Sequence, residues 1–533
     1  AVYMGDDRPG IMGIADFDGD GLAEIYYKNQ IHSAETGVLL AQGTGDWETE
    51  VNSAPVAVNI LPSTPNLELV SGGIIYAVPD LSNRNPGSPM NLTVAADIND
   101  LGAQFYPKEL FDAVEYQLTN YSSTSVADMN GDGHLDVVLS GARGSSTGNT
   151  AIYFWDVHNN TYSYYEPPDP TYPGGWPWGT SRPNLGDANG DGQMDILFIA
   201  GNQLFALTLD AGGNLVPLWP SPRILNDSRS GIVTVTIYDF DNDGNPEVVY
   251  RDSQQLVIVD GATGQDVKWS TVCQSHTMTE GPIIADVDGD GGTDITVPCN
   301  YNSSFDINDP IQQQALGALN IFYSSENLWL PTRKVWNQPG YFVVNINDDL
   351  TVPRRQMDQG MIYGQDPCSN GIPGPVRPFN IFLNQTPTIS ADGCPFYPAP
   401  DVSFVGDNPN AQPGDPDYKD PNDPSYFPAV NVIPPICGDL GIEVEFNIIN
   451  DGSLNLSTTI PVSFWDGDPT IDPVPAQPAT LLYQQDLVLT DFRIGDTLSI
   501  NGVVFNSTGK AFRLYIVLND DGTSLPAGQG SGT

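Results

Sequence analysis

The sequence predicts an all-β protein, and three observations support this prediction. Gly and Pro number 54 and 46 among the 533 residues, so turns are frequent. Short runs rich in Val, Ile, Tyr and Phe recur between the turn clusters, as β-strands do. No run has the period of an amphipathic helix. The length exceeds one ordinary core and indicates about two to four domains, or fewer if one is a large all-β domain.

The charge of the chain excludes several classes of partner. It carries 66 Asp and Glu against 19 Lys and Arg, which gives a formal net charge of −47. Such a surface repels phosphates and anionic lipids, so we expect neither nucleic acid nor direct membrane insertion. Because only 16% of the residues are charged and 40% are hydrophobic, the chain is not a disordered acidic tail. No run approaches the roughly 18 apolar residues of a membrane span.

One nine-residue pattern occurs five times, beginning at Asp16, Asp128, Asp187, Asp239 and Asp286. Each copy has oxygen-bearing side chains at positions 1, 3, 5 and 9 and Gly at position 6, and the backbone carbonyl of position 7 can add an oxygen. Calcium prefers about six to eight oxygen ligands, and Gly permits the sharp turn. We therefore predict about five calcium ions. The predicted ligands are Asp16, Asp18, Asp20, Leu22, Glu24; Asp128, Asn130, Asp132, His134, Asp136; Asp187, Asn189, Asp191, Gln193, Asp195; Asp239, Asp241, Asp243, Asn245, Glu247; Asp286, Asp288, Asp290, Gly292 and Asp294.

Position 12 of the pattern distinguishes two families of loop. An EF-hand requires a carboxylate there, followed by a helix. The five copies instead have side chains that cannot bind calcium, namely Tyr27, Leu139, Phe198, Tyr250 and Val297. The flanking residues read as strands on both sides. The EF-hand interpretation is therefore excluded, and each loop is predicted to join two strands.

A loop of this kind between strands resembles the FG-GAP/VCBS (integrin α-like) repeat of bacterial surface proteins, notably of Bacteroidetes-like organisms. The resemblance implies a calcium-binding β-propeller. The last four copies begin about 50 residues apart, which suits one four-stranded blade each. In the longer first gap, Pro55–Leu61 followed by Leu67–Val70 looks like a repeat that has lost its ligands, and Val94–Leu101 like another remnant. The prediction is six or seven blades.

The rest of the chain is assigned to ring closure and to a second module. Arg333–Pro353 resembles a stretch that follows such propellers, and we expect it to close the ring. The propeller is assigned to residues 1–385 and a Pro-rich connector to residues 386–400. Strand runs in residues 401–526 have the spacing of an antiparallel sandwich and resemble the bacterial cell-adhesion-related (CARDB-like) Ig-like domain. Residues 527–533 read as a flexible linker, and we expect the chain to be a processed piece of a longer polypeptide.

The five cysteines are widely spaced and form no CxxC pair, so a zinc site is not expected. Cys273 and Cys299 flank one repeat and could bridge neighbouring strands. For the others, Cys394–Cys437 is the preferred pair, with Cys368 left over. Few, widely spaced cysteines in an acidic β protein fit an oxidising exterior.

The function predicted from these features is that of a secreted bacterial cell-surface protein, extracellular, acting in adhesion or in building an extracellular assembly or filament. Calcium would stabilise the blades, and the partners would be other surface proteins, glycans or copies of itself. No nucleophile elbow, HExxH or phosphate loop occurs, so we expect no enzyme. The alternative is a carbohydrate-binding, lectin-like propeller module of a larger secreted polysaccharide-acting protein. It would use the aromatic residues of Tyr162–Trp178, although packing of that segment is the favoured interpretation.

Overall fold

The structure is a computed structural model of the chain. It describes residues 11–43, 51–61, 64, 66–81, 88–112, 117–168, 180–226, 234–241, 243–274, 281–299, 318–324, 329–347, 350–353, 356, 359–360, 377, 379–387, 402–405, 430–433, 441–450, 459–466, 480–490, 492, 497–506 and 514–518. In this part of the chain, no helix is long and apolar enough to cross a membrane.

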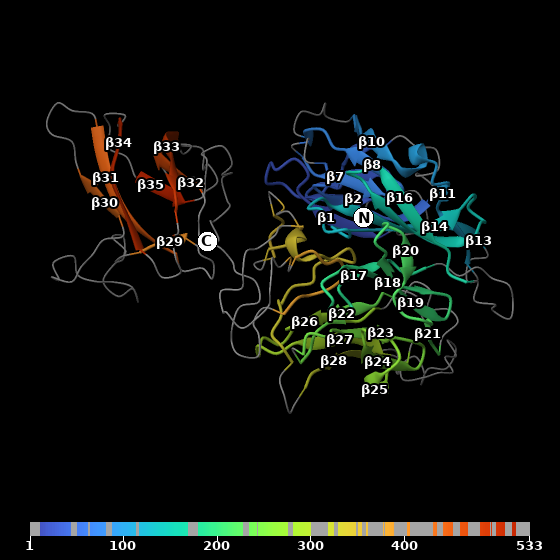
Figure 1. The fold of residues 1–533 in the computed structure, drawn as a ribbon. Coiled ribbons are helices and arrows are strands. Elements are labelled where there is room, and N and C mark those ends of the chain that lie inside the picture. Colours follow the sequence, from blue (N-terminus) through green and yellow to red (C-terminus); the bar gives the residue numbers. More distant parts are fainter. Residues whose placement is uncertain are drawn as a thin grey trace, which may run out of the picture. The chain divides into compact units, whose positions relative to one another are not determined.

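The chain divides into two compact units, each all-β (Figure 1). The first unit comprises residues 1–362 and 377–396, and the second comprises residues 363–376 and 397–533. Helical turns in the described part are short 3-10 segments such as η2 (Ile98–Leu101) and η4 (Val343–Asn345). The all-β prediction is therefore confirmed.

The described strands of the first unit form six separate sheets, numbered here in chain order. Sheet 1 contains β1 (Met12–Ala15), β2 (Glu24–Tyr27), β3 (Gln30–Ser33), β4 (Leu39–Gln42) and β9 (Met90–Asn91). Sheet 2 contains β6 (Val56–Val58), β7 (Glu68–Ser71), β8 (Ile74–Ala77) and β10 (Thr93–Asp97). Sheet 3 contains β5 (Val51–Ala54), β11 (Phe105–Tyr106), β12 (Lys108–Asp112), β13 (Gln117–Ala127), β14 (Asp136–Arg143), β15 (Thr150–Asp156) and β16 (Thr161–Tyr165).

The other three sheets follow along the chain. Sheet 4 contains β17 (Asn184–Gly186), β18 (Asp195–Ala200), β19 (Gln203–Leu209), β20 (Leu215–Pro217) and β21 (Arg223–Ile224). Sheet 5 contains β22 (Thr236–Tyr238), β23 (Glu247–Arg251), β24 (Gln255–Asp260) and β25 (Val267–Val272). Sheet 6 contains β26 (Ile283–Ala285), β27 (Asp294–Cys299) and β28 (Ala318–Phe322).

The five acidic loops occupy the same place in five of these sheets. Each one joins two neighbouring antiparallel strands of a sheet, and position 9 of the loop is the first residue of the second of these strands. The residue before the loop pairs with position 9 in every case, as Ala127 does with Asp136. The matching pairs are Ala15–Glu24, Gly186–Asp195, Tyr238–Glu247 and Ala285–Asp294. The predicted strand–loop–strand unit is therefore confirmed.

Sheet 2 tests the two predicted remnants of the repeat. Val58 of β6 pairs with Glu68 of β7, so Pro55–Leu61 and Leu67–Val70 form a repeat unit without the acidic loop, as predicted. The prediction for Val94–Leu101 is wrong, because these residues form β10, which pairs with β8 in the same sheet, and the turn η2 after it. They do not begin a further sheet.

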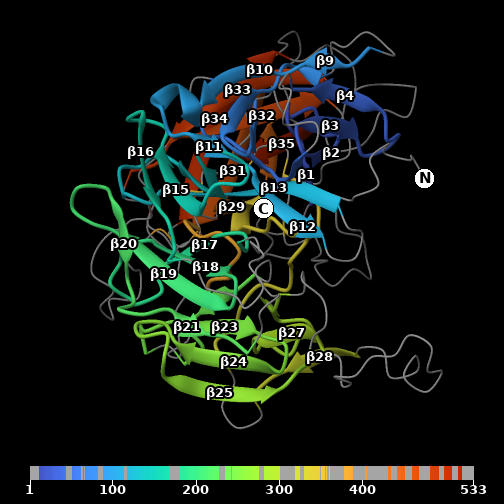
Figure 2. The same ribbon diagram turned by 90° about the vertical axis from the view of Figure 1, so that its right-hand side faces the viewer.

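Hydrophobic cores join the sheets in sequence. One cluster lies between sheets 1 and 2, a larger one joins sheets 2, 3 and 4, and two more join sheet 4 to sheet 5 and sheet 5 to sheet 6. Consecutive residues of one strand point to opposite faces and pack into two different cores. In β23, Val248 packs toward sheet 4 and Val249 toward sheet 6. Figure 2 shows sheets 5 and 6 side by side. A closed propeller is not found among the described residues.

Two stretches of the chain make hydrogen bonds to most of the sheets. They are residues 329–347 and 379–385, and together we call them the spanning segment. Its Gln338 accepts a hydrogen bond from the backbone N–H of Ile14 in β1 at 2.7 Å, and its Arg333 carbonyl accepts one from Asp286, next to β26, at 3.1 Å. Asn384 accepts from the N–H of Ile237 in β22 and donates to the carbonyl of Leu185 in β17. The segment expected to close a ring therefore contacts both the first and the last sheet.

The described strands of the second unit form two antiparallel sheets. One contains β29 (Val402–Phe404), β30 (Val430–Ile433), β31 (Gly441–Asn450) and β34 (Thr497–Asn506), and the other contains β32 (Thr459–Asp466), β33 (Thr480–Val488) and β35 (Leu514–Leu518). Residues of both sheets, such as Phe446 and Phe464, share one core. Identity with an Ig-like domain and the limits 401–526 remain predictions.

A disulfide joins Cys273, just after β25, to Cys299 at the end of β27, so it links sheets 5 and 6 as predicted. Cys368, Cys394 and Cys437 lie outside the described residues, as do most of the connector 386–400 and the whole of 527–533.

Candidate metal centres

The Asp at position 1 organises the backbone of each loop. In the loop that begins at Asp128, its two carboxylate oxygens accept hydrogen bonds from the N–H groups of Gly131 and Gly133, at 2.8 and 2.9 Å. Both glycines have positive φ, 77° and 90°, a conformation that a side chain would strain. The same pair of bonds forms at Asp16, Asp187 and Asp286, and Asp239 accepts from Gly244 at position 6. The recurrent glycines are therefore required by the turn itself.

The carboxylate at position 9 is buried in all five loops. It accepts a hydrogen bond from the backbone N–H of position 2, at 2.9 Å for Asp136 and Met129. The same bond occurs at Glu24, Asp195, Glu247 and Asp294, with lengths of 2.9–3.2 Å. The other oxygen, Oδ1, of Asp136 and of Asp195 is buried without a hydrogen-bond partner. An acceptor of this kind is costly unless something else binds it.

Burial disfavours the charged form of these groups. It raises the pKa of Glu24 and Asp136 to about 8 and that of Asp195 and Glu247 to about 7. Neighbouring carboxylates of the same loop raise each pKa further, while the backbone N–H bond opposes the shift. Without a counter-charge, these carboxylates therefore oppose folding whenever they are ionised.

Three loops bring carboxylates together tightly enough to hold a metal ion. In each, the candidate ligand atoms all lie within 4.8 Å of one another. The groups are Asp16, Asp18 and Glu24; Asp239, Asp241 and Asp243; and Asp286, Asp288 and Asp290. Because the donors are all oxygens and several are charged, the residues fit a hard cation such as Ca²⁺ better than a thiolate- or imidazole-preferring metal.

Not all predicted ligands converge in this way. In the second and third loops, position 3 is Asn, and its side-chain oxygen accepts the N–H of position 5, as Asn130 does from Asp132 at 2.9 Å. At position 7 the backbone N–H donates to the carboxylate of position 5 in every loop, as His134 does to Asp132. The others are Leu22, Gln193, Asn245 and Gly292. At position 7 the predicted ligand is the backbone carbonyl and not the side chain, and the variety of side chains at this position agrees with this.

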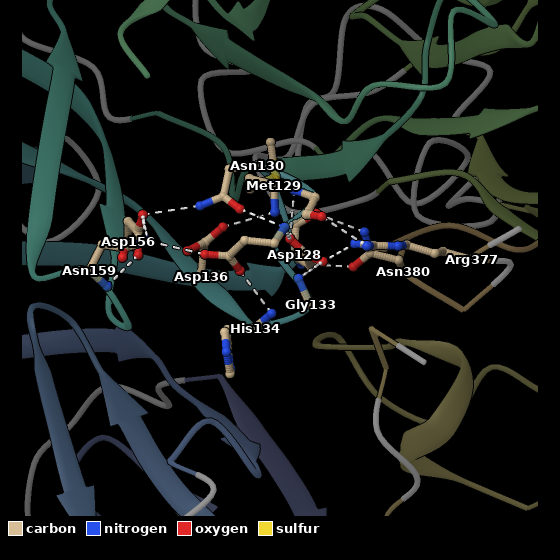
Figure 3. A network of polar contacts seen from close by, with 12 residues as sticks. Asp128, Met129, Asn130, Gly133, His134, Asp136, Asp156, Asn159, Arg377 and Asn380 are labelled. Atoms are coloured by element: carbon tan, nitrogen blue, oxygen red, sulfur yellow. Dashed lines mark hydrogen bonds and ion pairs between the residues drawn. The ribbon is translucent and has the colours of Figure 1, made fainter. Parts of the chain in front are cut away.

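The loop that begins at Asp128 has an outer layer that the sequence pattern does not contain (Figure 3). Arg377 donates to the Asp128 carboxylate and to the carbonyl of Gly131, and Asn380 exchanges two bonds with the Asp128 backbone. On the other side, Asp156 at the end of β15 accepts hydrogen bonds from Asn130 and Asn159. This loop is therefore held from both sides by residues distant in the sequence.

Two further candidates from the sequence have different outcomes. His134 stacks on His158 of the β15–β16 turn, with ring centroids 3.7 Å apart, so two histidines that are isolated in the sequence meet. Most of the aromatic run that suggested a carbohydrate site lies outside the described residues. Trp176 and Trp178 are among the residues that are not described.

Comparisons with known proteins bear on the same region. Residues 128–198 and 187–250 match the FG-GAP-like repeat, so the chain contains FG-GAP-like repeats that include the second, third and fourth loops. The chain is similar to the V. cholerae biofilm matrix protein Bap1, with a TM-score of 0.42 and 16% identity over 73% of this chain and 77% of that one. It is similar to an Agrocybe aegerita lectin that recognises non-reducing terminal N-acetylglucosamine, with a TM-score of 0.31 and 16% identity over 56% of this chain and 78% of that one. No curated protein matches the chain.

Proposed function

We propose that the protein is a secreted bacterial surface protein in which calcium stabilises a β-propeller, and that it acts in adhesion or in building an extracellular assembly. The observation that carries the proposal is the set of buried position-9 carboxylates, of which Asp136 and Asp195 each keep one oxygen without a hydrogen-bond partner. A Ca²⁺ ion at each loop would bind these oxygens and offset the repulsion between carboxylates. About five ions are expected.

The propeller assignment is supported by the shared plan of the sheets. The cores join sheet 1 through to sheet 6 in order. The spanning segment hydrogen-bonds to Ile14 in sheet 1 and to Asp286 beside sheet 6, where ring closure would occur. We propose that these contacts hold the ends of the ring together. The two-sheet second unit would then serve as an Ig-like spacer.

The extracellular location and the class of partner are part of the same proposal. The Cys273–Cys299 disulfide favours an oxidising compartment. Calcium at millimolar concentration is a feature of the exterior, and extracellular calcium modules bind it with Kd values of about 10⁻⁴–10⁻³ M. We propose other surface proteins, glycans or copies of the chain as partners, and a role in binding instead of catalysis.

The test is direct measurement of calcium binding and of its effect on stability. Isothermal titration of the chelator-treated protein is expected to show about five Ca²⁺ sites, and the melting temperature is expected to rise with calcium but much less with Mg²⁺, which prefers octahedral sites with bound water. Absence of both binding and a melting shift would overturn the proposal. The adhesion role is tested by binding of protein-coated beads to cells of the source organism, with and without calcium.

A further inference from the structure

Two of the acidic loops have one carboxylate fewer than the other three. We number the loops 1 to 5 in chain order. Loops 1, 4 and 5 have a carboxylate at each of positions 1, 3, 5 and 9, whereas position 3 is Asn130 in loop 2 and Asn189 in loop 3. The number of charged ligands is one of the properties that set the calcium affinity of such loops. The sequence alone therefore ranks loops 2 and 3 together as the weakest sites, but the structure separates them.

In loop 2, a carboxylate from outside the loop binds the Asn at position 3. Asp156 is the last residue of β15, and Val137 pairs with Trp155, so Asp156 lies across from Asp136 at position 9 of the loop. Its Oδ2 accepts a hydrogen bond from the side-chain amide of Asn130 at 3.1 Å. Loop 2 therefore has a fourth carboxylate beside it, which the neighbouring strand supplies (Figure 3).

Asn159 links the same carboxylate to a second loop residue. Its side-chain amide donates to Asp156 Oδ2 at 2.9 Å and to Asp132 Oδ2 at 3.1 Å, and its backbone N–H donates to Asp156 Oδ1 at 2.8 Å. Asp156 and Asn159 therefore hold the side chains at positions 3 and 5 of the loop. Partners of this kind orient metal ligands, and their loss typically weakens metal binding about 10- to 100-fold.

The position of Asp156 is unfavourable unless a cation is bound nearby. Asp136 and Asp156 are buried, with exposed fractions of 0% and 6%, and Asp136 Oδ1 has no hydrogen-bond partner. Burial raises the pKa of Asp136, and the charge of Asp156 raises it further. Like charges directly across two paired strands are destabilising. A calcium ion in loop 2 would bind the free oxygen and offset this repulsion.

Loop 3 lacks a corresponding partner among the described residues. The side-chain amide of Asn189 donates within the loop, to Asp191 Oδ2 at 2.9 Å. In sheet 4, Asp210 follows the last residue of β19, but it is exposed, and its hydrogen bonds come from Gly212 and Asn214 of its own turn. Loop 3 is therefore left with its own three carboxylates.

We propose that Asp156 belongs to the calcium site of loop 2, where it replaces the carboxylate that position 3 lacks and holds Asn130 and Asn159 in place. Loop 2 then has an affinity similar to that of loops 1, 4 and 5, and loop 3 is the weakest of the five. This inference rests on the calcium binding proposed above. It adds a residue and an order of affinities that the nine-residue pattern does not contain.

The test is a calcium titration of the full chain in which hydrogen exchange is followed in peptides that contain each loop. The free calcium concentration at half protection gives an apparent Kd for each loop. Loop 3 of the parent is expected to be protected last. Asp156→Asn is expected to raise the apparent Kd of loop 2 by about tenfold or more, and to change the other four by less than about twofold.

Two matched variants separate a role in the calcium site from a purely structural one. Asp210→Asn makes the same substitution after the third strand of sheet 4, and it is expected to leave the apparent Kd of every loop unchanged. Adding Asn130→Asp to Asp156→Asn exchanges the amide and the carboxylate of the bonded pair, so loop 2 regains its fourth carboxylate. This double variant is expected to recover most of the lost affinity, which a purely structural defect at residue 156 would not allow.

Four results would overturn the inference. They are an unchanged loop 2 in Asp156→Asn, a double variant that binds no better than Asp156→Asn alone, an equal loss at loop 2 in Asp210→Asn, and a parent in which loop 2 is as weak as loop 3. In each case the parent still binds calcium, so the proposed function stands. A parent in which calcium protects none of the loops would reject the proposed function together with this inference.

Discussion

In sheet 2 and in sheet 3 a buried carboxylate begins the second strand of the repeat, but its hydrogen-bond partners differ between the two sheets. Glu68 begins β7 as Asp136 begins β14, and both side chains are fully buried. Glu68 accepts hydrogen bonds from the N–H groups of Ile60 and Leu61, each at 3.0 Å, and from the hydroxyl of Thr64. Asp136 has one such donor, Met129, and its second oxygen has none.

The difference shows what the acidic loop lacks without a cation. Burial raises the pKa of both carboxyls. At Glu68 the donors of a short turn oppose that shift. At Asp136 the N–H of Met129 also opposes it, but the nearby carboxylates of Asp156 and Asp132 increase it, which none does at Glu68. The repeat in sheet 2 therefore dispenses with the acidic loop, because a hydroxyl and two N–H groups bind its buried carboxylate. The predictions below test this contrast, in order of decreasing effect.

Chelation is expected to produce the largest change. If every acidic loop holds calcium, each site contributes about 2.7 kcal/mol at a calcium concentration 100 times its Kd. Removing calcium should lower the melting temperature of the first unit by on the order of 10 °C. Calorimetry with and without chelator measures this. Hydrogen exchange should show greater loss of protection at the five acidic loops than at the Glu68 turn, and equal loss at both would contradict the contrast.

The calcium-free protein is expected to lose stability as the pH rises. The pKa of Glu24 and of Asp136 is about 8 in the folded chain, above the ordinary values near 4, so the folded state binds more protons than the unfolded state between these limits. The free energy of unfolding should therefore fall between about pH 4 and pH 8, by about 1.4 kcal/mol for each unit of pKa shift. Urea unfolding at several pH values measures it. Saturating calcium should flatten this slope, and an unchanged slope would contradict the interpretation.

Two matched amide substitutions separate the regions. Asp136→Asn keeps an acceptor for Met129 but removes the charge that would bind calcium, so the calcium-dependent stabilisation should fall by about 2–3 kcal/mol. Glu68→Gln makes the same change in the turn that has its own donors. It is expected to leave the calcium dependence of the melting temperature unaltered. If both variants lose the same calcium response, Glu68 belongs to a metal site as well.

The smallest effect is expected for Thr64→Val. This change removes the hydroxyl that donates to Glu68, and loss of one buried hydrogen bond should cost about 1–2 kcal/mol. The loss should be the same with and without calcium. Denaturant midpoints in the two conditions measure it, and a calcium-dependent loss would refute the proposed division between the regions.

The local parts of this arrangement could be predicted from the sequence. Positions 1 and 9 and the glycines of each loop lie within nine residues, and together with the apolar residues at position 12 and the strand-like flanks they predict the strand–loop–strand unit. Val94–Leu101 was misread because Asp97 caps the turn η2 through the N–H of Asn99, which is the same short-range chemistry that opens an acidic loop.

The outer layer of the loops could not be predicted in this way. Asp156 reaches Asn130 only because β14 and β15 pair, and Arg377 reaches Asp128 from 249 residues away. Single-sequence patterns carry no information on such contacts. The same holds for the amides of the spanning segment, since isolated Asn and Gln residues in a turn-rich chain have no distinguishing context.

The bond between Ile14 and Gln338 joins residues 324 positions apart, and this separation has a consequence for folding kinetics. Contacts so distant form late, because the loop they close is long and its entropy is lost all at once. The first strand of the unit therefore cannot reach its final hydrogen bonding until the spanning segment has emerged from the ribosome. Most of the unit must therefore be present before β1 has all of its hydrogen bonds.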